Sequence, residues 1–470
     1  MNKQILCKYI LAMVDFISLF SAALLSLAYN HYVRSDFFEN NYVAEFFQTH
    51  FCITFCAIIW YWLRLRHYTY RKPFWFELKE ILRTIFIFAI IELAILAFSK
   101  LDFSRGLWLG TWFISFTLVP LCRFLIKKYL IYTQWYIKDT FIIGAGQNAI
   151  DAYNALKSES YLGLNIKGFL VSEQHSSALN NTGVPVYIAT DLFLLNIAPT
   201  KFEQIIIALE EKESEELDFW IRALAKHHYR YVSVIPNLRG LPLYSTDISF
   251  LFSYDVLLLR INNNLAKASS RIIKRAMDII LSSMLILMLS PIALWLAYVI
   301  KRDGGKAIFK HKRVGQNGQK FSCYKFRSMV VNSEEVLTSL LNTNSEIKAE
   351  WEKDFKLKND PRITKIGKFL RQYSLDELPQ LFNVLKGNMS LVGPRPIVED
   401  ELVYYQNNVD YYFMAKPGMT GLWQISGRND IDYEKRIYFD SWYVKNWSLW
   451  NDIVILLKTV NVVLKRHGAY

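Results

Sequence analysis

Cysteine is scarce in this sequence, and the pattern of a disulfide-stabilised secreted domain is absent. The chain has 5 cysteines among 470 residues, and none of them form a CxxC pair. Cys52 and Cys56 lie inside an apolar run. We therefore expect free thiols, with the soluble parts of the chain facing a reducing compartment.

Acidic residues are also fewer than basic ones. The chain has 42 Asp and Glu against 55 Lys and Arg, which gives a formal net charge of +13. A basic chain of this kind can bind nucleic acid, anionic lipid or phosphorylated substrates. The sequence has neither an arginine-rich tail nor zinc-finger spacing, so nucleic acid is the weakest of these candidates. We expect no nucleic-acid partner.

Polar surface is also too sparse for one soluble domain, because 52% of the residues are hydrophobic and the mean hydropathy is +0.13. The length suggests roughly three structural units. No small-residue cleavage site follows the first apolar run. We therefore expect that run to be a membrane anchor and not a removed signal peptide.

Four apolar segments open the chain, at 10–29, 46–63, 81–98 and 107–126. Each is near the roughly 20 residues that a helix needs to cross the hydrocarbon core. Lysine and arginine concentrate before the first segment, in the loop 64–80 and after the last segment. By the positive-inside rule, both ends of this bundle are expected on the cytoplasmic side. The sequence thus predicts a transmembrane domain of four helices over residues 1–130.

Two acidic residues, Asp15 and Glu92, lie within these segments. Ionisable groups inside a membrane can mark an ion path. Two isolated acids in a small bundle are more often buried partners of other polar groups, and we favour that structural interpretation.

Residues 131–265 alternate between short apolar strands and helical stretches. The segment DTFIIGAGQNA, which starts at Asp139, contains a strand, a glycine turn and a helix start. This βαβ order predicts a Rossmann-like α/β domain with a largely parallel sheet. The turn Gly144-Ala145-Gly146 resembles a dinucleotide-binding turn, but Ala149 holds the third glycine position. A role in regulation or assembly is favoured over a catalytic NAD site.

A further apolar helix is expected over residues 276–300, with Ser290 and Pro291 in its middle. Basic residues flank both ends, so Lys274 and Arg302 are both expected to be accessible from the cytoplasm. Proline lacks an amide hydrogen and clashes with the preceding turn. The Ser290 hydroxyl can satisfy the carbonyl that this frees. These features predict a re-entrant helix, broken at Ser290-Pro291, in preference to a kinked helix that crosses the membrane.

Two strand-like runs follow, and the segment GQNG at 315–318 between them predicts a β-hairpin. Basic residues cluster along both runs, interleaved with aromatic ones. Their side chains can rest on anionic headgroups or bind phosphate, for which arginine offers a two-pronged fork. Both roles stay open for the cations of this cluster: Lys310, Lys312, Arg313, Lys325 and Arg327.

The segment SLDELPQLFNV, which starts at Ser374, holds two adjacent carboxylates, Asp376 and Glu377. Ser374 with Glu377 three residues later also fits a helix capping box. Pro379 argues against that alternative, because an amide hydrogen is needed past the first turn of such a helix. The carboxylates follow Arg371 by five residues. Carboxylates near a helix N-terminus and an arginine predict a site for phosphate and Mg²⁺.

Two glycine-containing loops complete the candidate site. Gly393-Pro394-Arg395-Pro396 predicts a rigid turn that presents one arginine. The segment KPGMTGLWQISGRND adds a second loop, with Lys416 and Arg428.

The last 200 residues or so, from Lys274, strongly resemble the bacterial polyprenyl-phosphate sugar-1-phosphate transferases. The matching motifs are the helix with Ser290-Pro291, YKFRSM, SLDELPQLFNVLKGNMSLVGPRP, KPGMTGLWQISGR and DSWYVKNWSLWNDI. A transmembrane bundle, a Rossmann-like domain and this unit, in that order, are similar to the large membrane members of the family. The loop WEKDFKLKNDPRIT and the ending VVLKRHGAY resemble the members that transfer galactose phosphate. Those enzymes start O-antigen, lipopolysaccharide, capsule or exopolysaccharide synthesis.

The resemblance implies a monotopic catalytic domain over residues 266–470 that enters the membrane through the re-entrant helix. Asp376 would be the nucleophile that attacks the β-phosphate of a UDP-hexose and releases UMP. Glu377 would help to bind Mg²⁺, and undecaprenyl phosphate would then accept the sugar phosphate. Binding of phosphate or nucleotide would fall to Arg313, Lys325, Arg327, Arg371, Pro394, Arg395, Pro396 and Arg428.

The resemblance also implies a location and partners. We expect a multi-pass protein of the bacterial inner membrane, with its catalytic domain on the cytoplasmic face and in contact with the lipid bilayer. UDP-galactose is the expected donor, with UDP-glucose as the alternative. The oligomeric state stays open, with a homodimer as one option. Two rival classes are an NAD-dependent sugar oxidoreductase built on the turn at 144–146, and a transporter or scaffold, which leaves the later charged motifs unexplained.

Overall fold

The chain divides into two compact units, Met1–Arg239 and Gly240–Tyr470. The sequence predicts an α/β domain that extends to residue 265. In the structure, the antiparallel strands β6 (Thr246–Leu251) and β7 (Val256–Ile261) belong to the second unit instead. The computed structural model describes residues 3–33, 42–99, 104–171, 179, 182–188, 204–210, 214–226, 229, 231–237, 246–251, 256–261, 264–302, 304–343, 360–427 and 432–465.

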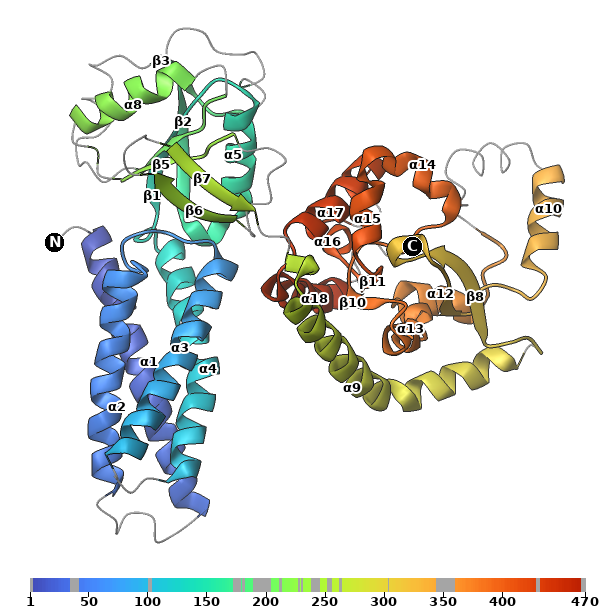
Figure 1. Cartoon of the computed structure of the whole chain (residues 1–470), viewed down its shortest axis with the longest axis horizontal. Helices are drawn as coiled ribbons and strands as arrows, with labels where there is room; N and C mark the ends of the chain where they lie inside the picture. The colour runs from blue at the N-terminus through green and yellow to red at the C-terminus, as the bar shows by residue number, and fades with distance from the viewer. Residues whose placement is uncertain are drawn as a thin grey trace. The chain divides into compact units, whose positions relative to one another are not determined.

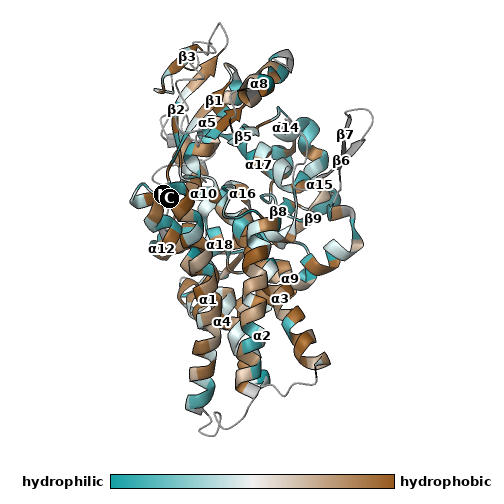
Figure 2. Cartoon of the chain, turned by 90° about the vertical axis from the view of Figure 1, so that its left-hand side faces the viewer, coloured by the Kyte–Doolittle hydropathy of each residue, from teal (hydrophilic) through white to brown (hydrophobic). Residues whose placement is uncertain are grey.

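The first unit begins with a bundle of long helices (Figure 1). Their bounds are α1 (Lys3–Val33), α2 (Tyr42–Ile59), α3 (Phe74–Phe98) and α4 (Arg105–Tyr132), and a π-helical turn, Trp60–Arg64, extends α2. Within the described residues, five helices are long and apolar enough to cross a membrane, these four and α9 (Ala268–Lys301). Figure 2 shows their largely hydrophobic composition. The protein therefore combines α and α/β architecture with helices that suit a membrane.

The interior of the bundle contains charged side chains in contact with one another. Asp15 accepts a hydrogen bond from Arg123 at 2.8 Å, and both residues are buried. Glu92 accepts one from the indole of Trp112 at 2.6 Å and lies 2.8 Å from a ring nitrogen of His50. The interpretation of Asp15 and Glu92 as buried partners of other polar groups is confirmed.

The α/β part of the first unit has a five-stranded parallel sheet in the order β3-β2-β1-β4-β5. The strand, glycine turn and helix expected from the sequence are present, as β1 followed by α5. Apolar side chains pack on both faces of the sheet. The element bounds are β1 (Lys138–Ile143), α5 (Gln147–Ser158), β2 (Leu164–Val171), β3 (Val186–Ile188), β4 (Gln204–Ile207), α8 (Ser214–Lys226) and β5 (Tyr231–Val234).

The carboxylate of Glu210 lies in the glycine turn before α5. The Oε1 atom of Glu210 accepts a hydrogen bond from the backbone N–H of Asn148 at 2.7 Å, and Asn237 donates to Oε2 at 2.9 Å. A Cβ atom at Gly146 would lie 2.4 Å from Glu210. Dinucleotides place their pyrophosphate at such a helix N-terminus. Because Glu210 fills that position, the geometry favours the regulatory or assembly interpretation over an NAD site.

In the described part of the second unit, short helices and three two-stranded sheets, β6-β7, β8-β9 and β10-β11, accompany α9. The hairpin expected at 315–318 is confirmed, with β8 and β9 antiparallel on either side of it. The remaining bounds are β8 (Ile308–Val314), β9 (Lys320–Phe326), α10 (Ser333–Thr343), α12 (Lys365–Gln372), α13 (Gln380–Lys386), β10 (Ser390–Val392), α14 (Leu402–Tyr405), α15 (Val409–Met414), β11 (Gly418–Thr420), α16 (Leu422–Ile425), α17 (Tyr433–Lys445) and α18 (Leu449–Lys465).

The long helix α9 bends partway along its length (Figure 1). Pro291 lies inside it and leaves the carbonyl of Leu287, four residues earlier, without its helical amide partner. The Ser290 hydroxyl donates to that carbonyl at 2.9 Å. The predicted compensation by Ser290 is therefore confirmed, and it explains why the break does not expose an unpaired carbonyl.

Both ends of α9 contact the rest of the second unit. Near its start, Lys274 donates to Asp452 at 2.7 Å. At its end, the carbonyl of Ile300 accepts from Arg327 at 2.9 Å. Lys274 is 9% exposed, so the expectation that this residue is accessible is wrong. The ion pair with Asp452 is the reason.

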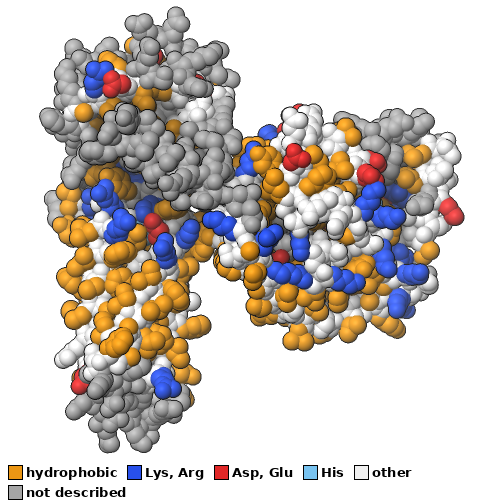
Figure 3. Space-filling view, viewed as in Figure 1, with side chains coloured by type: hydrophobic (Ala, Val, Ile, Leu, Met, Phe, Trp, Pro, Cys, Tyr) orange, Lys and Arg blue, Asp and Glu red, His pale blue; other side chains and the backbone are white. Residues whose placement is uncertain are grey.

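The outer side of α9 is apolar and uncovered within the second unit. In Figure 3, hydrophobic side chains gather along the edge that α9 forms, and Lys and Arg side chains lie in a row beside it. Such a combination suits the boundary between hydrocarbon and headgroups. The exposed apolar residues of α9 are Ile272, Ile273, Ile279, Ile280, Met284, Leu287, Met288, Ile292, Leu294, Trp295 and Tyr298.

Candidate active site

The two adjacent carboxylates lie on a short 3₁₀ turn, Leu375–Glu377, between α12 and α13. Ser374 has a positive φ of 56° and its side chain caps no backbone N–H. Pro379 stands at the N-cap position of α13. The capping-box alternative is therefore wrong, and the turn holds Asp376 and Glu377 ahead of the helix.

Lys325 of β9 reaches this turn from across the fold. Its Nζ atom donates to Glu377 Oε1 at 2.7 Å and lies 4.0 Å from Asp376 Oδ2. Burial alone would lower the pKa of Lys325, but the two carboxylates outweigh it and raise that pKa. Lys325 therefore stays cationic, and the three charges form one polar cluster.

The side chain of Asp376 is only 15% exposed, against 37% for Glu377. Burial, and after it the neighbouring charge of Glu377, raises the pKa of Asp376 to about 6. Lys325 and Arg371 oppose that rise. A carboxylate in this environment is ionised at neutral pH and is weakly solvated, which makes it a better nucleophile than an exposed one.

Two of the predicted arginines, Arg371 and Arg327, have different hydrogen-bond partners. Arg371, at the end of α12, donates to the Ser328 hydroxyl at 3.0 Å, and its charge interacts with Asp376. Arg327 instead donates to the carbonyls of Lys306 and Ile300, each at 2.9 Å. Arg371 thus belongs to the carboxylate cluster, whereas Arg327 ties the end of α9 to β9.

The turn Pro394-Arg395-Pro396 is fixed by its backbone. The N–H of Gly418 donates to the carbonyl of Pro394 at 2.8 Å, and Arg313 donates to that of Pro396 at 3.2 Å. Arg395 lies 3.9 Å from Glu401, at the distance limit of an ion pair. The guanidinium therefore has donors left to offer a phosphate. Arg428 lies outside the described residues.

The sequence of the second unit matches the family described as Bacterial sugar transferase, over residues 269–466. Residues 65–234 match a second family, described as CoA-binding domain. An uncharacterized sugar transferase of Haemophilus influenzae is 56% identical over 473 residues, with 100% of both chains covered. The chain belongs to the bacterial sugar transferase family.

Two further relatives of this sugar transferase have more specific names. Undecaprenyl-phosphate galactose phosphotransferase of Salmonella typhimurium is 54% identical, over 99% of this chain and 98% of the relative. UDP-galactose-lipid carrier transferase of Erwinia amylovora is 54% identical, over 90% of this chain and 88% of the relative. The similarity extends over the first unit as well as the second.

Two residues that support the transferase site were missed by sequence reasoning. Asp440 of α17 is buried and accepts hydrogen bonds from the Tyr405 hydroxyl at 2.8 Å and from the backbone of Arg395. Burial raises its pKa to about 7. Asn383 of α13 bonds the backbone of Tyr324 at 2.9 Å and of Ser322 at 2.7 Å. Both lie within motifs quoted from the sequence, but their partners are 35 to 61 residues away, so the motifs did not show what these side chains hold.

The donor set of the transferase fits Mg²⁺ only in part. Among the described residues, no group of three or more His, Cys, Asp or Glu side chains could hold a metal ion. The dyad offers two adjacent carboxylates, and Mg²⁺ commonly binds one or two carboxylates while substrate phosphates and waters complete its octahedron. Glu377 is the more exposed of the pair and would be the protein ligand of such a metal.

Proposed function

We propose that this sugar transferase moves galactose 1-phosphate from UDP-galactose to undecaprenyl phosphate. The observation that carries the proposal is the Asp376 carboxylate, largely buried and flanked by Lys325 and Arg371. The names of the two 54% identical relatives support the same reaction and sugar. The product would be undecaprenyl-diphosphate galactose, which begins a cell-surface polysaccharide such as O-antigen.

Asp376 would act as the nucleophile in two displacements. Its oxygen bonds to the β-phosphorus of the donor, and the bond from that phosphorus to the bridging oxygen of UMP breaks. A phosphate oxygen of undecaprenyl phosphate then attacks the same phosphorus and releases the Asp376 carboxylate. Lys325, Arg371 and Arg395 would offset the negative charge of the phosphates during both steps.

Glu377 would hold Mg²⁺ together with the donor diphosphate. Bound there, the metal would supply positive charge to the phosphate oxygens and the leaving UMP. Lys325 bonds one oxygen of Glu377 and would hold that carboxylate in place for the metal.

The bend of α9 supports a re-entrant placement in the membrane. The two ends of α9 contact one compact fold through Lys274 and Ile300, whereas the ends of a helix that crosses the membrane lie on opposite faces. The four helices of the bundle would span the bacterial inner membrane, with the α/β sheet and the second unit on its cytoplasmic side, where UDP-sugars are present.

Release of UMP tests this function. Purified protein is mixed with undecaprenyl phosphate, Mg²⁺ and either UDP-galactose or UDP-glucose, and Asp376→Asn serves as the control. We expect UMP to form faster from UDP-galactose and only with the wild-type chain. Equal or faster turnover of UDP-glucose would refute the sugar assignment, and no UMP from either donor would refute the transferase.

A further inference from the structure

A small pocket lies within the first unit, between the helix bundle and the α/β sheet. Its residues come from the start of α1, the loop between α2 and α3, the segment after α4, and strands β1 and β5. The cavity volume is about 30 Å³, which corresponds to roughly two water-sized groups. The lining residues are Gln4, Cys7, Lys8, Leu11, Tyr68, Thr69, Tyr70, Arg71, Trp135, Tyr136, Lys138 and Tyr231.

Three cations and no carboxylate line this pocket: Lys8, Arg71 and Lys138. The guanidinium of Arg71 lies 4.1 Å from the ring centre of Tyr136, and the ammonium of Lys138 lies 3.2 Å from that of Tyr231. Lys138 is 4% exposed. Cations brought together in a buried site repel one another and lose hydration. An anion in the pocket would offset both costs.

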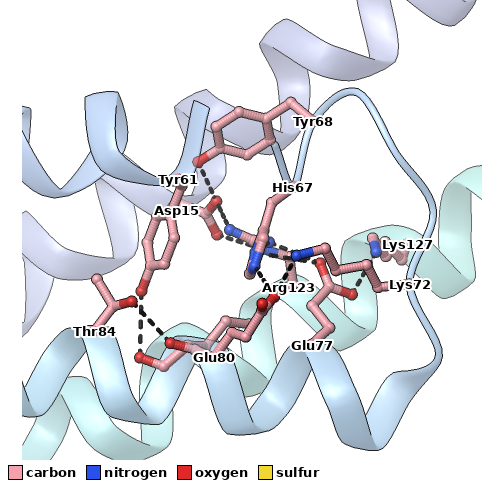
Figure 4. Close-up of polar contacts among 11 residues, drawn as sticks. Asp15, Tyr61, His67, Tyr68, Lys72, Glu77, Glu80, Thr84, Arg123 and Lys127 are labelled. Atoms are coloured by element: carbon pink, nitrogen blue, oxygen red, sulfur yellow. Dashed lines mark hydrogen bonds and ion pairs between the residues drawn. The ribbon is translucent and has the colours of Figure 1, made fainter. Parts of the chain in front are cut away.

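A buried ion network holds the loop that carries Arg71 and Tyr68 (Figure 4). The Tyr68 hydroxyl donates to Asp15 at 2.6 Å, and Asp15 also accepts from Arg123. His67 in the same loop lies 2.8 Å from Glu80 of α3. The loop is therefore anchored at two points, and the pocket wall that it forms is fixed before any ligand arrives.

Arg71 also connects the loop to the α/β domain. Its Nη1 atom donates to the carbonyls of Leu162 at 2.7 Å and Gly163 at 2.8 Å. Gly163 has a positive φ of 61°, and a Cβ atom there would lie 2.8 Å from Arg71. The guanidinium is thus held by two carbonyls and a ring.

We propose that this pocket binds a phosphate group, carried either by an anionic phospholipid headgroup or by a soluble phosphate compound. Charge-assisted hydrogen bonds from Lys and Arg are the strongest that a phosphate can accept. The volume has room for about two water-sized groups, such as oxygens of one phosphate, and not for a whole dinucleotide or coenzyme A. Basic pockets at the cytoplasmic ends of membrane helices bind lipid headgroups, and Trp and Tyr side chains gather at membrane interfaces. The lipid source alone rests on the proposed membrane orientation.

The experiment compares the wild-type chain with Lys8→Gln and Lys128→Gln. Lys8 is half-buried at the pocket, so its substitution should leave the fold intact. Lys128 is exposed on α4 and does not line the pocket, so it controls for the loss of one charge. One arm counts phosphatidylglycerol retained from mixed phosphatidylglycerol and phosphatidylcholine nanodiscs by native mass spectrometry. The other arm measures the dissociation constant of inorganic phosphate in detergent.

Removing one cation should weaken binding about fivefold, since each contributes about 1 kcal/mol near an anionic surface. Loss of retained phosphatidylglycerol in Lys8→Gln alone supports the pocket and identifies a lipid source. Weaker inorganic phosphate binding in Lys8→Gln alone, with lipid retention unchanged, supports the pocket with a soluble source. Identical behaviour of Lys8→Gln and Lys128→Gln in both arms overturns the proposal. Neither readout requires sugar transfer, so failure of the proposed reaction would remain a separate result.

Discussion

At the residue scale, the two neighbouring carboxylates have different surroundings and therefore different capacities. Asp376 is the more buried and has a pKa raised to about 6, whereas Glu377 is paired with Lys325 and partly exposed. A buried anion suits attack on phosphorus, and an exposed one suits a metal that comes with the substrate. The pair can thus divide nucleophile and metal ligand between adjacent positions.

The raised pKa of Asp376 predicts the acid limb of the pH profile. The carboxyl group is neutral below its pKa of about 6 and anionic above it, and only the anion can attack. The value of kcat/KM, which reports the free enzyme, should therefore fall about tenfold for each pH unit below 6. A pH series with UMP as readout measures this limb. A limb centred near pH 4, the ordinary aspartate range, would contradict the environment described for Asp376.

Substitution of the neighbour tests the second role. Glu377→Gln removes the charge of the proposed metal ligand, so the Mg²⁺ concentration for half-maximal activity should rise at least about tenfold, with partial recovery at high Mg²⁺. Glu399→Gln is the matched control, because Glu399 is an exposed partner of Lys320 away from the dyad. An unchanged Mg²⁺ requirement in Glu377→Gln would remove that residue from the metal site.

The residue scale also shows where sequence reasoning reached its limit. The dyad, Arg371 and Arg395 were legible because each belongs to a short motif. The pair of Lys325 with Glu377 joins positions 52 residues apart, and a basic hairpin residue alone did not show which carboxylate it meets. Arg327 belongs to the same basic cluster as Lys325, yet it donates to backbone carbonyls at and after the end of α9 and not to a carboxylate of the dyad.

At the scale of elements, α9 was the most predictable part of the fold. A proline in an apolar helix leaves one carbonyl without an amide donor, and a preceding serine can donate to that carbonyl. The hydrogen bond from Ser290 to Leu287 was predictable for this reason. The glycine turn before α5 was predictable from the sequence, but the presence of the Glu210 carboxylate in it was not. Glu210 lies 62 residues beyond Asn148, so its occupation of the anion position depends on how the strands pair.

Labelling of introduced cysteines tests the placement of α9. Arg271 and Arg302 are exposed near its two ends, and the five native cysteines are first replaced. A membrane-impermeant thiol reagent should reach both positions from the cytoplasmic side, because the helix returns to the face it left. Labelling of position 302 from the periplasm is incompatible with re-entry. In Pro291→Ala the helix regains an amide donor and should straighten, so activity should fall.

At the scale of the whole molecule, composition and charge pattern were enough to separate apolar helices, an α/β part and a basic catalytic part. The sequence placed residues up to 265 in the α/β domain, whereas strands β6 and β7 lie with the second unit. Contacts between distant segments decide such a boundary, and a single sequence does not encode them locally. The ion network around Asp15 and Arg123 likewise joins positions 108 residues apart.

The central claim is that the whole protein transfers its sugar phosphate through Asp376. Full-length enzyme is mixed with UDP-galactose and Mg²⁺ without lipid acceptor, and its intact mass is measured, followed by peptide mapping. Asp376→Asn is the control. Because the folded pKa of Asp376 exceeds that of a free aspartate, its ionised form opposes folding at neutral pH, and the Asn variant should stay folded. We predict one added hexose phosphate on Asp376 in the wild-type chain and none in the variant. An adduct that persists in Asp376→Asn, or that maps to another residue, would contradict the account.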